Sequence, residues 1–258
     1  MSINDINNAA AAMNQLKARY DGFLDDADAQ IAQRQAAYDA LSANLNGVVF
    51  DRMSFEFTWD PDEQNPTNVR GGVYARADIA INQAPAGAYV KIKVPGGKDC
   101  HWEYTVPLKP GQNVEFVKAD QNAANVIFVS YESGGYTWHR GLIFGIGTGV
   151  KFTSVNAVVG EKVNGLGFVS TPGPIKIGIG GTFHAVSSSF SGPQGAALVA
   201  LSNGTLLNFA VSSVSVDTFA LINTFSNCLV IGAKSNFTTL NGGVLQQGGV
   251  DGTSVITS

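Results

Sequence analysis

The sequence predicts a mainly β protein that begins with an α-helical coiled coil and continues as antiparallel β-sandwich-like modules, assembled as a homotrimer. Three observations predict this fold class. Residues 3–45 contain no proline and a single glycine, and their apolar positions recur at helical spacing. From Val48 onward, apolar and polar residues alternate with the period of a half-buried strand. Beyond residue 140, charged residues become rare while Gly, Ser, Thr and Val accumulate.

The N-terminal helix carries an apolar seam whose members are separated by alternating steps of three and four residues, as in a heptad repeat. The seam residues are Ile6, Met13, Leu16, Tyr20, Phe23, Ala27, Ile31, Tyr38, Leu41 and Leu45, with Ala9 and Arg34 at the remaining positions. Two steps of four meet at Ala27, which is a stutter that locally unwinds a supercoil. Ser2, followed three residues later by Asp5, is expected to cap the first turn.

A helix with a narrow apolar seam and a wide polar face cannot bury the seam by itself, so the seam must pack against another surface. The helix either packs on its own domain or associates with other copies of itself, and its length and N-terminal position favour self-association. Tyr20, Phe23 and Tyr38 are large for a tight dimer, which favours three strands or a looser bundle. The alanines of the seam would also admit a partner protein. We therefore expect residues 1–46 to oligomerise the chain or to attach it to a larger assembly.

Residues 47–140 are expected to form a compact antiparallel module of the sandwich or jelly-roll type. Strand-like segments are predicted at residues 53–59, 73–81, 89–94, 102–106, 126–131 and 136–139. The last two flank Glu132-Ser133-Gly134-Gly135, which indicates a hairpin. The aromatic residues Trp102, Tyr104, Tyr136 and Trp138 fall on neighbouring predicted strands and form a candidate ligand surface, since flat rings beside amides and Asp are typical of sugar sites. Core packing is the alternative explanation for these rings.

Residues 141–258 contain only seven charged side chains, whereas charged residues make up 14% of the whole chain. A soluble monomer carries more surface charge than this. The region is therefore buried between subunits, or stacked as a β-solenoid or interleaved fibre, or disordered, and its regular apolar content argues against disorder. We favour subunit burial, because a coiled coil already supplies the symmetry. Strands are predicted at residues 142–146, 150–159, 175–179, 182–186, 197–201, 206–211, 213–219, 228–231 and 243–246.

No catalytic, cofactor-binding or metal-binding residues are predicted. The three histidines have no second ligand at metal spacing. In Asp99-Cys100-His101-Trp102-Glu103, neighbouring side chains of a strand face opposite sides, so a mixed-facing strand is expected instead of a Cys–His nucleophilic pair. Cys100 and Cys228 are too far apart in sequence to form a metal-binding motif, and they are expected to be buried thiols.

Two further motifs resemble ligand-binding sites, but a structural explanation is simpler for each of them. Gly145, Gly147 and Gly149 lack the spacing of a dinucleotide fingerprint and the Lys-Ser/Thr of a phosphate loop, so they mark a close backbone approach. The turn containing Asp60, Asp62 and Glu63 offers hard oxygen ligands for Ca²⁺, but we favour a solvated acidic turn.

Charge and hydropathy exclude several partners. The net charge of −4 and the isoelectric point near 5.3 leave no basic stripe for nucleic acid. No apolar run is long enough for membrane insertion. The segment MSINDINNAA has neither a basic region nor an apolar core, so we expect no Sec signal peptide.

The Asn/Ala-rich start SINDINNAAAAMNQL, the continuation DGFLDDADAQIAQRQAAYDAL and the charge-poor β-rich tail together resemble the fibre and spike proteins of tailed bacteriophages. The resemblance covers the layout of the whole chain and rests on no diagnostic motif. It implies an N-terminal virion attachment, a trimeric coiled coil and outward-pointing β-modules. Polysaccharide-degrading spikes of this type usually carry a long parallel β-helix, of which we find no sign in the sequence.

The resemblance implies a non-enzymatic, homotrimeric virion fibre or appendage protein, such as a short tail fibre, collar fibre or head fibre. It would be assembled in the host cytoplasm, contact other virion proteins and bind a glycan or protein on the host surface. Three alternatives remain open. They are a capsid decoration or tail-assembly protein without a host ligand, a polysaccharide-degrading tailspike that uses carboxylates such as Asp60, Glu103 and Asp217, and a bacterial adhesin.

Overall fold

A computed structural model describes residues 2–160, 167–168, 173–177, 180–201, 205–224, 228–248 and 254–257 of the chain. The chain divides into two compact units, Met1–Asp51 and Arg52–Ser258. Each unit is considered by itself below. Within the described part of the chain, neither helix has the length and apolar character that a bilayer-spanning segment requires.

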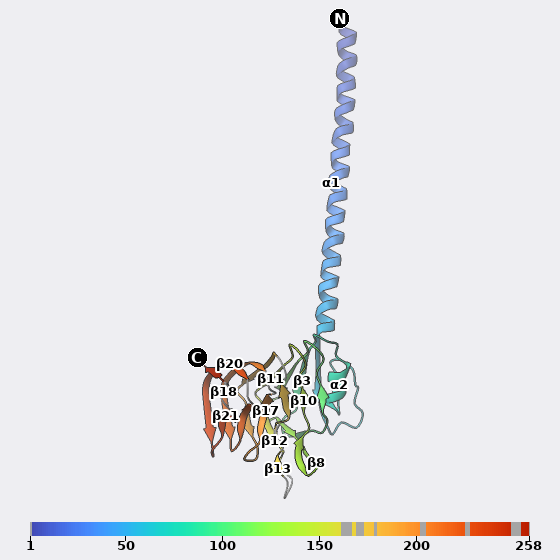
Figure 1. The fold of residues 1–258 in the computed structure, drawn as a ribbon. Helices are drawn as coiled ribbons and strands as arrows, with labels where there is room; N and C mark the ends of the chain where they lie inside the picture. The colour runs from blue at the N-terminus through green and yellow to red at the C-terminus, as the bar shows by residue number, and fades with distance from the viewer. Residues whose placement is uncertain are drawn as a thin grey trace. The chain divides into compact units, whose positions relative to one another are not determined.

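The first unit is the continuous helix α1 (Ile3–Met53), which runs past the predicted end near residue 45 (Figure 1). Its N-terminus has the predicted cap. The Ser2 hydroxyl accepts the Asp5 backbone N–H at 3.3 Å, and the Asp5 carboxylate accepts the Ser2 backbone N–H at 2.9 Å. This reciprocal pair satisfies two backbone donors that a helix start otherwise leaves free.

The predicted seam lies on the surface of α1. Met13 is 71% exposed, Leu16 and Phe23 are 68% exposed and Tyr38 is 67% exposed. These values are high for large apolar side chains, so the described part of α1 by itself leaves the seam exposed. Leu45 belongs to the helix, but its side chain lies outside the described residues.

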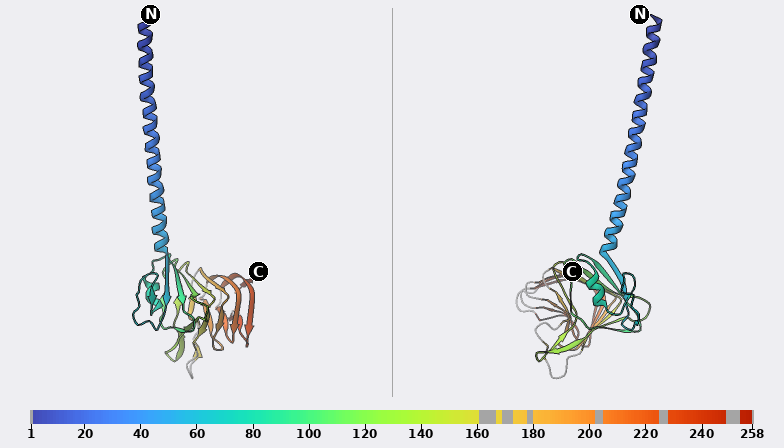
Figure 2. Two further views of the ribbon diagram at one scale, coloured as in Figure 1. Left: turned by 180° about the vertical axis from the view of Figure 1, so that it is seen from behind. Right: turned by 90° about the vertical axis from the view of Figure 1, so that its right-hand side faces the viewer.

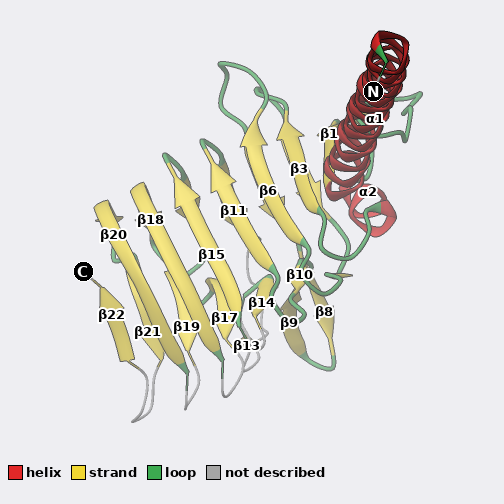
Figure 3. Cartoon of the chain, turned by 90° about the horizontal axis from the view of Figure 1, so that it is seen from above, coloured by secondary structure: helices red, strands yellow, loops and turns green. Residues whose placement is uncertain are grey.

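The second unit is a parallel β-solenoid, in which the chain winds in coils that contribute strands to three faces (Figures 1 and 3). The first face contains β2 (Val73–Tyr74), β1 (Ser54–Trp59), β3 (Tyr89–Val94), β6 (Asn113–Lys118), β11 (Gly149–Thr153), β15 (Gly181–Val186), the first halves of β18 (Leu206–Asp217) and β20 (Leu229–Leu240), and β22 (Ser254–Thr257). The second face contains β4 (Asp99–Trp102), β7 (Asn125–Phe128), β12 (Asn156–Val159), β16 (Ser189–Ser191) and the second halves of β18 and β20. The third face contains β5 (Val106–Pro107), β10 (Leu142–Ile143), β14 (Ile175–Ile177), β17 (Ala197–Leu201), β19 (Ala220–Thr224) and β21 (Val244–Gly248).

The predicted antiparallel β-sandwich is therefore wrong. Among the described residues, every strand pairing is parallel except that of β8 (Ser130–Ser133) with β9 (Tyr136–His139), while β13 (Gly167–Phe168) pairs with β9 in parallel. Alternation of apolar and polar residues shows where a strand lies, but it contains no information about which strand pairs with it. The stacked coils form a short parallel β-helix, which is the β-solenoid that was one of the alternatives for residues 141–258.

Most predicted strand positions hold, with local exceptions. The strand predicted over 102–106 is instead the end of β4, a loop at residues 103–105 and the start of β5. The hairpin β8–β9 is confirmed, with Gly134 and Gly135 at positive φ in its turn. The predicted strand over 73–81 instead divides into β2 and the short helix α2 (Ala77–Gln83). The last two residues of the strand predicted over 175–179 lie outside the described residues.

The corners between the first and second faces are stacked above one another. Ser154, Ser187, Ser213 and Asn236 each have φ between 49° and 56°, and each falls between a first-face segment and a second-face segment. Residues in this left-handed region interrupt the extended backbone and turn it. For this reason β18 and β20 pass through a corner without a loop, and they join the first two faces into one 13-stranded sheet.

The interior of the solenoid is filled by stacked apolar side chains. Across the first face, Phe116 of β6 stacks on Phe152 of β11 with ring centroids 5.2 Å apart, and Phe183 of β15 stacks on Phe209 of β18 at 5.9 Å. All four rings are 0–1% exposed. Because parallel strands in register place the same face of consecutive coils inward, one buried ring per coil builds a continuous column.

The helix α2 closes the first end of this column, as the right-hand view of Figure 2 shows. The Lys109 ammonium donates to the carbonyls of Asn82 at 2.6 Å and Ala84 at 2.5 Å, and the Gln112 amide donates to the Ile81 carbonyl at 3.0 Å. These donors satisfy carbonyls that the end of a helix leaves without intrahelical partners.

The outer side of the first face carries a transverse row of charges. Glu56, Lys91, Glu115 and Lys151 are successive register partners on β1, β3, β6 and β11. Glu115 is only 6% exposed, and it accepts hydrogen bonds from the Tyr89 hydroxyl, from the Thr153 hydroxyl at 2.7 Å and from the Lys151 ammonium at 2.9 Å. Burial opposes its ionisation, but these three donors outweigh burial and lower the pKa of Glu115 below its ordinary value.

The lowered pKa of Glu115 makes stability depend on pH. The stabilisation is complete above the ordinary glutamate pKa of 4.5 and is lost as the pH falls through the lower pKa of the folded protein. We expect Glu115→Gln to lower the free energy of unfolding by about 1–2 kcal/mol at neutral pH, because an amide replaces a charged acceptor. The difference in unfolding free energy between the variant and wild type should shrink as the pH falls below the pKa of Glu115 in the folded protein. Urea unfolding at a series of pH values measures this difference. Glu132→Gln, on the exposed hairpin, is the control, and a Glu115→Gln effect that is independent of pH would contradict the assignment.

Candidate ligand pocket at the first coil

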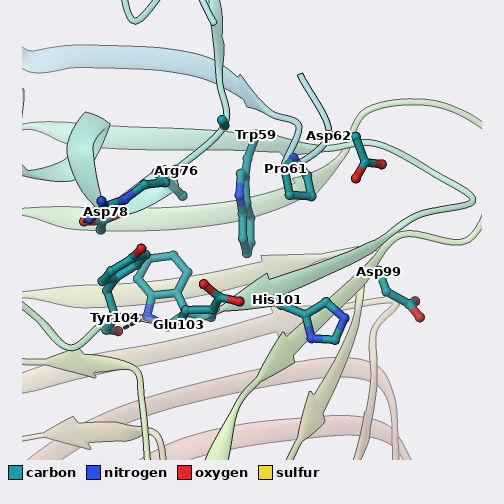
Figure 4. A pocket seen from close by; sticks show the side chains of 12 residues that line it. Trp59, Pro61, Asp62, Arg76, Asp78, Asp99, His101, Glu103 and Tyr104 are labelled. Carbon is teal, nitrogen blue, oxygen red and sulfur yellow. Dashed lines mark hydrogen bonds and ion pairs between the residues drawn. The ribbon is translucent and has the colours of Figure 1, made fainter. Parts of the chain in front are cut away.

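A cavity of about 300 Å³ opens beside the first complete coil, which consists of β3, β4 and β5. We call it the acidic pocket. Three segments line it, namely the end of β1 with the turn that follows, the link from β2 into α2, and β4 with its continuation to Tyr104 (Figure 4). Four carboxylates, one guanidinium, one imidazole and three aromatic rings face it, and they belong to Asp62, Asp78, Asp99, Glu103, Arg76, His101, Trp59, Trp102 and Tyr104.

Strand β4 presents its residues to opposite sides, as the mixed-facing prediction required. Asp99 and His101 are exposed, whereas Cys100 and Trp102 are buried. Burial raises the pKa of the Cys100 thiol to about 12, so the thiol stays protonated and inert. Cys228 is also buried, as predicted.

The aromatic floor of the pocket is part of the core. Trp102 is 2% exposed, and its ring meets Trp59 edge-on with centroids 5.6 Å apart. The Trp102 indole N–H donates to the Tyr104 carbonyl at 2.5 Å, which ties the segment after β4 to the floor. Trp102 therefore supports the pocket, while Tyr104, which is 37% exposed, forms its wall.

Arg76 organises the wall opposite β4. Its guanidinium donates to both oxygens of Asp78, at 3.1 Å and 2.7 Å, and its Cζ lies 3.8 Å from the centroid of the Tyr104 ring. The hydrogen bonds to the Asp78 carboxylate are the main cause of the raised pKa of Arg76, so the guanidinium is charged throughout the accessible pH range. Both contacts hold the residue in one place, so Arg76 is a fixed part of the wall.

The acidic turn after β1 is held by a lysine. The Lys98 ammonium lies 2.7 Å and 2.8 Å from the two oxygens of Asp60 and 3.3 Å from an oxygen of Asp62. It occupies the position between the two carboxylates that a bound Ca²⁺ would need. Within the described residues, no group of three or more His, Cys, Asp or Glu is placed to hold a metal ion.

A ladder of hydrogen-bonded side chains crosses the second face and ends at the pocket. Ser189 donates to Asn156 at 2.5 Å, Asn156 donates to Asn125 at 3.0 Å, and Asn125 donates to the Asp99 carboxylate at 2.8 Å. These residues are register partners on consecutive strands β16, β12, β7 and β4. The ladder therefore fixes the orientation of Asp99 at the rim of the pocket.

The predicted ligand surface divides into two places. Trp102 and Tyr104 meet at the acidic pocket, whereas Tyr136 and Trp138 lie on the β8–β9 hairpin. Trp138 donates its indole N–H to the Ser133 carbonyl at 2.9 Å, and the Lys176 ammonium lies 5.4 Å from its ring centroid. Tyr136 is 49% exposed near the tip of the hairpin.

Sequence reasoning missed Trp59 and Arg76 as neighbours of Tyr104. They lie on segments that are distant from Tyr104 in sequence, and the parallel pairing of β1 with β2 and β3 brings them together. The close backbone approach predicted for the glycine motif is found at Gly145, where an added Cβ would lie 3.1 Å from the Leu108 carbonyl oxygen. At Gly149 an added Cβ would instead meet the side chains of Thr182 and Asn113.

Comparison with protein-family models, with curated proteins and with solved structures found no match for this chain. The interpretation of the pocket therefore depends on its geometry and chemistry.

The two rings of the pocket should respond differently to truncation. We expect Trp102→Ala to lower the free energy of unfolding by about 3–5 kcal/mol, because it leaves a cavity among Trp59, Phe116 and Phe128. Tyr104→Ala should cost about 1 kcal/mol or less, since it loses mainly the contact with Arg76. Urea unfolding of both variants measures the difference, and equal costs would show that Trp102 is not part of the core.

Proposed function

We propose that the protein is a homotrimeric, fibre-type structural protein of a bacteriophage virion, in which α1 associates with copies of itself and the β-solenoid presents a receptor-binding surface. The observation that carries the proposal is the uncovered apolar seam along a helix of 51 residues. The assignment to a virion follows the resemblance in layout described above.

A lone helix with this surface is not a stable end state. In water most helix stability comes from packing an apolar face, and the described part of α1 leaves its seam exposed. Identical heptad seams satisfy one another when copies align in parallel and in register. The large rings of Tyr20, Phe23 and Tyr38 favour three copies, because a trimer offers a wider central space than a dimer.

The solenoid suits the role of a rigid body. Its coils are joined by parallel backbone pairing and by a buried aromatic column, so the surface side chains sit on a stiff frame. In the C-terminal coils the outer side of the first face carries small side chains. Ala210 and Ala233 line a depression of about 370 Å³ there, with Lys151 and Lys234 also in its lining. This surface supports the expectation that residues 141–258 pack against neighbouring subunits. Several weak sites held together in one trimer would then bind a host surface by avidity.

The oligomeric state tests the proposal directly. We expect light scattering and native mass spectrometry on the full chain to give about three times the 27.0 kDa of one chain. Leu16→Asp places a charge in the seam and should dissociate the assembly, because three buried carboxylates would repel one another without partners. Asn14→Asp, which adds the same charge off the seam, is the matched control. A monomeric full-length chain in dilute buffer would contradict the trimer, and another stoichiometry would contradict the three-stranded seam.

A polysaccharide-degrading spike is the second candidate, and the parallel coils are the observation that favours it. The carboxylates considered for it from the sequence do not gather, however. Glu103 lines the acidic pocket, Asp60 is bound to Lys98, and Asp217 lies at the end of β18, where it accepts from Asn241 at 2.9 Å. Asp99 and Glu103 in the acidic pocket are the better pair to test.

A reducing-end assay on host polysaccharide separates the two candidates. The structural proposal expects no release of reducing ends by wild-type protein. If release is seen, and Asp99→Asn or Glu103→Gln lowers its rate by about 100-fold or more, the pocket is catalytic and the enzymatic candidate replaces the structural one. A structural protein without any host ligand would instead fail to bind host cells, whether or not it is trimeric.

A further inference from the structure

We propose that the acidic pocket binds a saccharide unit that carries a free ammonium group, as an unacetylated hexosamine does. The proposal rests on the receptor-binding function proposed above and names the ligand class of the surface. Three features of the pocket support the proposal. Some of its carboxylates are bonded to cations and others are not, Asp99 has a fixed orientation, and aromatic rings lie beside carboxylates in a cavity of limited size.

The charges of the pocket favour a cationic ligand. Asp78 is paired with Arg76, and Asp62 shares Lys98 with Asp60, so these two carboxylates already face cations. Asp99 and Glu103 have no ion-pair partner within bonding distance among the described residues. Asp99 receives only the neutral amide of Asn125, and Glu103 acts on Arg76 at longer range, where its charge helps to raise the pKa of the guanidinium after the larger effect of Asp78. Two carboxylates without a bonded cation at one cavity attract a cation and repel an anion.

Arg76 is not a free cation for an anionic ligand, because its charge is paired with Asp78. The Nε and Nη2 atoms of its guanidinium each donate to the Asp78 carboxylate, and one side of its plane lies against the Tyr104 ring, so only the remaining N–H groups at Nη1 and Nη2 face other partners. Uronic acids and other anionic sugars would meet unpaired carboxylates without a free cation in return. The pocket therefore discriminates against them by repulsion as well as by the lack of a partner.

The geometry favours a donor-rich ring over a simple cation. Figure 4 shows Glu103 between Tyr104 and His101, with Trp59 across the pocket and Asp99 beyond His101. Ionised carboxylates only accept hydrogen bonds, so the ligand must supply donors, and hydroxyl and ammonium groups of an amino sugar do so. The volume of about 300 Å³ lies at the lower end of the range for small-molecule sites, which suits one small ring.

The side-chain ladder prepares the site before the ligand arrives. Because Asn125 holds Oδ1 of Asp99, the carboxylate keeps one orientation and its Oδ2 stays available. A fixed acceptor costs less conformational entropy on binding than a freely rotating one. Asn125 is thus a positioning residue for this site, acting through Asp99.

Isothermal titration calorimetry with the full-length protein tests the ligand class. The probes are a glucosamine oligomer, the N-acetylated oligomer of the same length, a galacturonate oligomer and a lysine oligomer. We expect the glucosamine oligomer to bind at least about tenfold more tightly than the N-acetylated one, since one charge-assisted hydrogen bond is lost on acetylation. The galacturonate oligomer should show no binding, and added salt should weaken binding of the glucosamine oligomer.

Variants connect the binding to the pocket. Glu103→Gln should weaken binding of the glucosamine oligomer by at least about tenfold, and Asn125→Ala should weaken it less. Glu132→Gln, which removes an exposed carboxylate on the β8–β9 hairpin, is the matched control and should leave the affinity unchanged. Urea unfolding confirms that each variant is folded before its affinity is interpreted.

Each of several results would overturn the assignment. They are equal binding of the free and acetylated oligomers, unchanged affinity in Glu103→Gln, lysine-oligomer binding as tight as that of the sugar, and no binding of the glucosamine oligomer. Light scattering on the same samples keeps the two proposals separate, because a trimer that binds no amino sugar refutes the ligand class alone.

Discussion

Parallel backbone pairing between consecutive coils is the interaction on which the rest of the β-unit depends. It holds equivalent residues of each coil in register, so that inward positions form columns and outward positions form rows. The stacked pairs Phe116–Phe152 and Phe183–Phe209, the charged row through Glu115 and the ladder from Ser189 to Asp99 are three results of the same register. Parallel sheets normally need long crossovers, but here the crossovers are themselves strands of the other faces.

The stack of coils has two ends, and the charged and aromatic side chains of the acidic pocket lie at the first of them. Interior coils cover one another, whereas the first coil has only β1, β2 and α2 beside it. The backbone between β1 and α2 does not form another coil in register with the coils below it. This irregular segment leaves a cavity next to β4. Arg76, Asp62 and Trp59 reach that cavity from segments that cap the stack. The acidic pocket is thus a consequence of closing the column.

The two units need different partners. The solenoid satisfies most of its apolar surface internally through its coils, whereas α1 exposes Met13, Leu16 and Phe23 to solvent. This contrast separates a domain that folds around its own core from a helix whose apolar seam is exposed, which is why we propose that the helix associates with other copies. The stutter at Ala27 would allow the two halves of the seam to pack differently in an assembly.

The sequence by itself determined the local features. The cap formed by Ser2 and Asp5, the apolar seam of α1, the β8–β9 hairpin, the mixed-facing strand β4 and most strand positions follow from short-range patterns. One local pattern was ambiguous. In residues 73–81, alternation predicts a strand, yet Ala77, Ala80, Ile81 and the following Ala84 also recur at helical spacing. In the structure these four side chains are buried, and the Gln112 amide donates to the Ile81 carbonyl near the end of the helix.

Only the tertiary structure decided which strands pair and which side chains meet. An antiparallel and a parallel partner bury the same alternating face, so the sequence pattern cannot distinguish them. The repeat of the coils would have indicated the answer, but the first-face strands begin at unequal intervals, at Tyr89, Asn113, Gly149 and Gly181. The segments between β7 and β10 and between β12 and β14 lengthen two of the coils and obscure the period. Because the neighbours of Tyr104 are set by that pairing, the acidic pocket was not visible until the coils were stacked.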